Sequence, residues 1–174
     1  FEVCRQLREF YRKPIIFITS HDDPLEEIAC FKAGADDFVL KSSPFEVLYQ
    51  RIKRFGVRSS QFEANSVLTF GELFFNPNKA DCLYQGKALG LTSEEFELFY
   101  FIATKRDLVV SRQTILKVLK GADYDGGDRS IDIKIARIRN KLKIGGLSPH
   151  IILSVRSKGY QFNFIELTQI ALGE

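Results

Sequence analysis

The spacing of apolar residues predicts alternating helices and strands in the first third of the chain. The continuous apolar runs 15–19 and 38–40 are typical of strands buried in a parallel sheet. Segments 3–11, 23–34 and 44–55 predict helices before, between and after these strands, because they are amphipathic or carry Pro at the first turn and Gly at the end. This alternation predicts an α/β layer fold.

A different order of elements follows from residue 67 onward. Turn residues separate short strand-like pieces, which predict a small antiparallel sheet from 68–75, 80–84 and 88–91. Thr92 and Glu95 form a capping-box pattern before the apolar run 96–103, so a buried helix is expected there. Ser111 is placed to cap a second helix that ends at Gly121.

A third helix is expected to follow Asp128, which is placed to cap it. Its apolar residues recur at helical spacing and predict one buried side, formed by Ile131, Ile135, Ile138 and Leu142. The opposite side is expected to face solvent or a partner and carries Ser130, Ile133, Lys134, Arg137 and Lys141, with Arg129 and Arg139 flanking it. An alternating hairpin over 151–164 follows, and its tip carries Arg156 and Lys158.

Charge is concentrated in one part of the chain. The 174 residues have a formal net charge of +3, and residues 1–66 are balanced at ten basic and ten acidic residues. Residues 129–158 contain eight basic residues and one acidic residue. Such a basic surface on a balanced body is expected where a protein meets a polyanion, although a charge run is also typical of a solvated face.

Composition excludes several other classes. The hydrophobic content of 45% argues against disorder, and no apolar run approaches the ~20 residues that cross a bilayer. The N-terminus has no signal-peptide pattern, so we expect a cytoplasmic protein without a membrane partner. Cys4, Cys30 and Cys82 lack metal or redox spacing and are expected to be buried, whereas His21 and His150 are expected at the surface.

The third helix and the hairpin together predict a winged helix-turn-helix that binds double-stranded DNA. An Arg side chain can reach guanine O6 and N7, an apolar side chain can contact a thymine methyl group, and Lys or Ser can bind phosphates. The third helix would enter the major groove, and the basic tip of the wing would contact the backbone or the minor groove.

Over nearly its whole length the sequence resembles the OmpR/PhoB type of two-component response regulator. The matching motifs lie in the predicted helices and wing and read Leu91-Thr92 with Glu95-Phe96, Val110-Ser111-Arg112, Asp128-Arg129-Ser130-Ile131-Asp132, Ile138-Arg139-Asn140-Lys141-Leu142, and Val155-Arg156 with Lys158-Gly159-Tyr160. Upstream, Gly34-Ala35-Asp36-Asp37-Phe38 with Lys41 is similar to the end of the CheY-like receiver domain. Within the family, the 41–44 stretch and the wing are most similar to RstA-type members.

The resemblance implies a phosphorelay regulator with a sensor histidine kinase as partner and a homodimer bound to promoter direct repeats. Thr19 matches the switch hydroxyl, Phe38 the switch aromatic residue and Lys41 the lysine that contacts the phosphoryl group. Asp37 and Arg51 match an ion pair between subunits.

The chain also departs from the family pattern. It begins at Phe1 without Met, and we expect a doubly wound receiver that lacks its first three strands, with the phosphoacceptor Asp and the acidic pair that holds Mg²⁺. No cofactor is therefore expected in this chain. Ser42 replaces the usual Pro after the lysine, and Glu27 and Val47 do not supply the usual second charge pair. Ser157 replaces the first glycine of the wing turn.

We therefore predict a partial α/β receiver over 1–55, a linker over 56–66, an α+β winged-helix domain over 67–166 and a tail over 167–174. The leading hypothesis is a sequence-specific transcription regulator. The alternative is a protein-interaction module whose basic helix, or the loop 121–127, docks an acidic partner such as RNA polymerase. An enzyme is not expected, because no His or Cys pairs with a carboxylate in a catalytic pattern.

Overall fold

The computed structural model describes residues 1–56, 67–106, 108–120 and 129–163. The chain divides into two compact units, residues 1–61 and 62–174. Apart from Gly56, the predicted linker lies outside the described residues, as do the predicted tail, the loop 121–127 and the helix cap Asp128.

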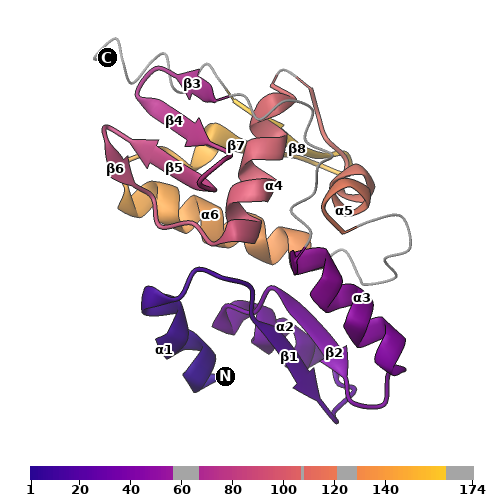
Figure 1. Ribbon diagram of the computed structural model, residues 1–174. Coiled ribbons are helices and arrows are strands. Elements are labelled where there is room, and N and C mark those ends of the chain that lie inside the picture. The colour runs from indigo at the N-terminus through magenta and orange to yellow at the C-terminus, as the bar shows by residue number, and fades with distance from the viewer. Residues whose placement is uncertain (57–66, 107, 121–128, 164–174) are drawn as a thin grey trace. The chain divides into compact units, whose positions relative to one another are not determined.

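The first unit alternates helices and strands (Figure 1), in the order α1 (Glu2–Phe10), β1 (Ile16–Thr19), α2 (Pro24–Ala33), β2 (Asp37–Leu40) and α3 (Phe45–Gly56). The two strands are parallel, with Thr19 opposite Leu40. Asp23 caps α2 by accepting a hydrogen bond from the Leu25 N–H at 2.8 Å. β1 is less buried than its apolar pattern predicts, because no described residue covers Ile18, which is 47% exposed.

The second unit begins with an antiparallel sheet of four short strands in chain order, β3 (Leu68–Phe70), β4 (Leu73–Asn76), β5 (Asp81–Tyr84) and β6 (Lys87–Ala88). The predicted strand-like piece 68–75 folds back on itself as the β3–β4 hairpin. Gly71 makes this reversal possible, because it lies in the turn with a φ of 56°, a region that favours glycine.

Three helices and a hairpin complete the second unit, in the order α4 (Ser93–Thr104), α5 (Arg112–Lys120), α6 (Arg129–Ile144), the 3-10 helix η1 (Pro149–Ile151), β7 (Ile152–Val155) and β8 (Gly159–Phe162). Two of the three caps predicted for these helices lie within the described residues, and both are confirmed. Thr92 and Glu95 form the capping box of α4, and Ser111 Oγ accepts a hydrogen bond from the Thr114 N–H at 3.1 Å.

The core of the second unit lies around α4, which contacts α5, α6, β5 and β8 (Figure 1). Aromatic rings fill it, with centroids 4.9 Å apart for Phe75 and Phe99 and 4.7 Å apart for Phe70 and Phe162. This packing holds α6 against α4 and so decides which sides of α6 remain accessible.

The cysteine and histidine predictions are confirmed. Cys4, Cys30 and Cys82 are buried and form no disulfide, and both histidines are exposed. None of the helices in the described part of the chain is long and apolar enough to cross a membrane.

Candidate functional site

One side of α6 packs into the core as its apolar spacing predicts. The four predicted residues, Ile131, Ile135, Ile138 and Leu142, are all buried. Because these residues fix the rotation of the helix, they determine the positions of all the polar side chains on it.

The structure corrects the prediction that the opposite side of α6 faces solvent. Ser130 and Lys134 are buried, and the Lys134 side chain, only 2% exposed, binds Glu94 on α4. Arg137 Nη2 lies 2.8 Å from Glu95 Oε1, and Lys141 Nζ lies 2.5 Å from Glu95 Oε2. Three of the predicted DNA-binding cations are therefore ion-paired with the first turn of α4.

Glu95 is the centre of this ion-pair network. Its side chain is fully buried, and its Oε2 also accepts the capping bond from the Thr92 N–H at 2.8 Å. Burial alone would raise the pKa of Glu95, but the charges of Arg137 and Lys141, with hydrogen bonds from Lys141 and Thr92, hold that pKa below its ordinary value. Glu95 is therefore a buried carboxylate that holds α6 to α4.

A third side of α6 is the accessible one. Asp132, Ala136 and Asn140 are exposed, and Ile133 is half-buried. We call Ile133, Ala136 and Asn140 the accessible row of α6. Each of these residues precedes by one position a cation of the row predicted to face DNA. The accessible row is thus rotated by one residue, because Glu94 and Glu95 bind the cations of the predicted row. The sequence signal was the pair of acidic residues in the first turn of α4, which apolar periodicity does not report.

Arg139 and Asp132 connect α6 to the β7–β8 hairpin. Arg139 Nη2 donates hydrogen bonds to Ile152 O at 2.5 Å and to Ser154 Oγ at 2.9 Å. Asp132 Oδ1 accepts hydrogen bonds from the Tyr160 hydroxyl at 2.5 Å and from Arg112 Nε at 2.8 Å. Arg139, predicted to bind DNA, thus binds the hairpin. Asp132, Arg112 and Tyr160 lie in the family motifs of the sequence, but no site role was predicted for them.

Tyr160 is neutral over a wide pH range in this environment. Burial, followed by the hydrogen bond to Asp132 and the charge of that carboxylate, raises the pKa of Tyr160 to about 12. The Arg112 guanidinium lies over the Tyr160 ring, 4.9 Å from its centroid. The three side chains form one compact cluster, which we call the Asp132 cluster.

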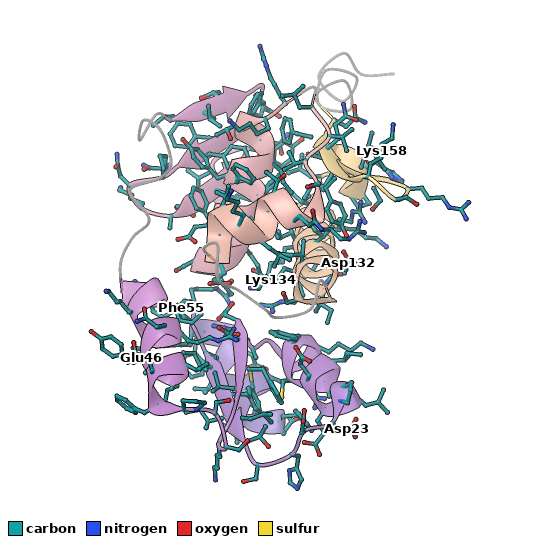
Figure 2. The ribbon with its side chains drawn as sticks, turned by 90° about the vertical axis from the view of Figure 1, so that its right-hand side faces the viewer. Asp23, Glu46, Phe55, Asp132, Lys134 and Lys158 are labelled. Carbon is teal, nitrogen blue, oxygen red and sulfur yellow. The ribbon has the colours of Figure 1, made fainter. Side chains whose placement is uncertain are left out.

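The tip of the hairpin presents the two predicted cations. Arg156 and Lys158 are exposed, and Figure 2 shows Lys158 extending from the β7–β8 hairpin, with Asp132 and Lys134 labelled on α6. Ser157 adopts a left-handed φ of 59°, so serine takes the conformation expected of the family's glycine. Gly159 lies against Val110 and Ser111, the two residues that precede α5. A Cβ added to Gly159 would be 2.0 Å from Val110 O. The hairpin can therefore pack in this position only with glycine at residue 159.

The structure brings two of the three predicted switch residues together in the first unit. The Lys41 N–H donates a hydrogen bond to Thr19 O at 2.6 Å, so both lie at the carboxyl ends of the parallel strands. Phe38 is half-buried on β2, opposite Phe17. The described residues contain no group of three or more His, Cys, Asp or Glu that could hold a metal ion, so they do not fit the Mg²⁺ site that the resemblance implies.

Asp37 and Arg51, which were predicted to pair between subunits, form an ion pair within one chain. Arg51 Nη1 lies 3.0 Å from Asp37 Oδ1 and 3.2 Å from Asp37 Oδ2 within the same chain. Asp37 is buried in the single chain, and its pairing with Arg51 between two subunits stays a prediction. This pair holds α3 to the start of β2.

Comparison with known proteins finds matches over both units. Residues 86–162 match the family described as "Transcriptional regulatory protein, C terminal". Over 171 residues the chain is 33% identical to the transcriptional regulatory protein RstA of Escherichia coli. The match covers 92% of this chain and 72% of RstA.

Two solved structures extend this likeness. The response regulator DrrB of Thermotoga maritima, an OmpR/PhoB homologue, is 29% identical with a TM-score of 0.50, over 93% of this chain and 72% of that chain. The RstA DNA-binding domain of Klebsiella pneumoniae, solved in complex with the RstA box, is 34% identical with a TM-score of 0.51, over 57% of this chain and 98% of that domain. The predicted fold class, receiver elements followed by a winged helix, is confirmed.

Proposed function

The chain belongs to the OmpR/PhoB family of two-component, DNA-binding response regulators, and on that premise we propose how it binds DNA. Helix α6 enters the major groove with its accessible row, and the β7–β8 wing contacts the backbone or the minor groove. The chain is a transcription regulator and not an enzyme. The observation that carries the proposed mode is the accessible row of α6 together with the exposed cations at the wing tip.

Several of the accessible side chains have a chemistry suited to this role. Asn140 can bind adenine through two hydrogen bonds, and Ile133 can contact a thymine methyl group. Ala136 is small enough to allow the helix to approach the bases closely. Arg156 and Lys158 are cations with exposed side chains, which suits them to phosphates or to a narrow minor groove.

The other predicted DNA-binding residues take different parts in the proposal. Arg129 begins α6, but its side chain lies outside what the structure describes, so its DNA contact stays a prediction from the sequence. Arg137 is 17% exposed and bound to Glu95, so any base contact that it makes requires that bond to break. Four other residues position α6 and do not contact DNA in this proposal: Ser130, Lys134, Arg139 and Lys141.

DNA binding measured by fluorescence anisotropy tests this assignment. The probes are a duplex that the wild-type chain enriches from a randomised library and a scrambled duplex of the same composition. Asn140→Ala should relax base preference, whereas Lys158→Ala should weaken binding to both duplexes alike. Lys87→Ala, which removes an exposed cation from β6, is the matched control. Unchanged affinity and preference in both test variants would refute the proposed mode.

We also propose the partners that family membership suggests, namely a sensor histidine kinase, RNA polymerase and a second copy of the chain on direct repeats, all in the cytoplasm. The closeness of Thr19 and Lys41 supports the kinase assignment. Sedimentation of the chain with a duplex carrying one or two half-sites tests the homodimer. Two copies should bind the double site, and a single copy on both duplexes would contradict the proposal.

A further inference from the structure

The Asp132 cluster places an anionic group on the surface that we propose meets DNA. The Asp132 side chain is 49% exposed and lies one residue before Ile133 in the accessible row. Its Oδ1 binds Arg112 and Tyr160, and Oδ2 has no partner among the described side chains. A carboxylate in this position repels phosphates, so it weakens every DNA complex that brings phosphates near it.

The same carboxylate joins α6 and the wing, which form the proposed DNA-binding surface, to α5. Asp132 belongs to α6, Arg112 begins α5, and Tyr160 belongs to the wing strand β8. Arg112 also donates from Nη2 to the Tyr160 hydroxyl at 3.3 Å, which closes the cluster. The wing is further fixed where Val110 and Tyr160 exchange two backbone hydrogen bonds, at 2.7 and 2.9 Å. The hydrogen bonds of Asp132 therefore set the position of the wing relative to α6.

These two effects act in opposite directions on two kinds of DNA. Repulsion weakens binding to any sequence, whereas a fixed wing favours the one arrangement in which base contacts and wing contacts form together. Resting on the proposed DNA-binding function, we propose that Asp132 is a specificity-determining residue that lowers affinity for unselected DNA and positions Arg112 and Tyr160 for the selected site. A merely structural residue would change both affinities alike.

Two substitutions separate repulsion from positioning. Asp132→Asn removes the charge and weakens the hydrogen bonds, so affinity for a scrambled duplex should rise about two- to fivefold. For the duplex enriched by the wild-type chain, the loss of positioning should offset this gain, and the ratio of the two affinities should fall about tenfold. Tyr160→Phe leaves the charge in place. It should leave the scrambled duplex unaffected and weaken the selected duplex about threefold.

The experiment measures both affinities for the full chain by anisotropy at one salt concentration, with the fold of each variant checked by circular dichroism. Lys87→Ala, the control, should leave the ratio of the two affinities unchanged. Equal weakening of both duplexes by Asp132→Asn, or an unchanged ratio in Tyr160→Phe, would overturn the inference. If Asp132→Asn does not fold, the ratio measured for Tyr160→Phe decides. A wild-type chain that enriches no duplex would instead refute the proposed function.

Discussion

Replacement of Glu95 by glutamine tests whether Arg137 and Lys141 of α6 stabilise the fold of the second unit. Glutamine has nearly the same volume and retains an oxygen that can accept the capping bond from the Thr92 N–H. It loses the negative charge that binds Arg137 and Lys141. The substitution therefore isolates the ion pairs from the packing and from the helix cap.

The size of the effect follows from burial. Removing one partner of a buried ion pair costs about 3–5 kcal/mol, because the other charge is left unpaired. Arg137 and Lys141 are 17% and 24% exposed, so each can regain part of its hydration in the variant. The carboxylate also no longer has to be dehydrated. We expect the free energy of unfolding of the second unit to fall by about 2–3 kcal/mol.

Urea-dependent hydrogen exchange, read in peptides of α4 and α6, follows the second unit separately from the first. Glu72→Gln is the control, because it removes an exposed carboxylate that binds only Gln85 among the described residues, and its cost should be below about 0.5 kcal/mol. The folded-state pKa of Glu95 lies below its ordinary value of 4.5, so its stabilisation is present above that pH and is lost as the pH falls through the folded-state pKa. A cost below about 1 kcal/mol at neutral pH, or a cost that does not shrink in acid, would refute the reasoning.

Three further outcomes are expected. Gly159→Ala should destabilise the second unit by more than about 2 kcal/mol in chemical denaturation, because its Cβ would meet Val110 O, and a smaller loss would show that the wing can move away. Asp37→Asn should destabilise the first unit by about 2–3 kcal/mol without changing the oligomeric state in sedimentation, since Arg51 binds Asp37 within one chain. In an alkaline absorbance titration, one tyrosine should ionise only near pH 12. The stability that Tyr160 contributes should be fully present below pH ~10 and be lost as the pH rises from there through about 12.

Local sequence signals predicted most of the fold. Caps and turn residues placed the helix starts at Thr92 and Ser111, and the spacing of apolar residues identified the buried side of α6. These features depend on neighbours in the chain, so they can be read from a short window. The exposure of Ile18 could not be predicted in this way, because it depends on what packs against β1.

The site was predicted less completely than the fold. The mainly polar side of the helix was expected to face solvent or a partner, but Lys134 and Lys141 instead bind carboxylates 40 and 46 residues earlier in the chain. Such pairs depend on how α4 and α6 cross, which periodicity along one helix does not specify. The same limit applies to Asp132, because no local pattern predicts that it joins α6 to the wing.

The central claim is that Arg156 and Lys158 of the wing bind DNA, whereas Lys134, Arg137 and Lys141 of α6 hold the fold. The salt dependence of affinity for the selected duplex tests it most directly, because each lost phosphate contact reduces the slope of log K against log salt by about 0.9. Arg156 and Lys158 replaced together by alanine should reduce the slope by about 1.8, and Lys134→Met should leave it unchanged. A slope that is unchanged in the wing variant and reduced in Lys134→Met would contradict the claim.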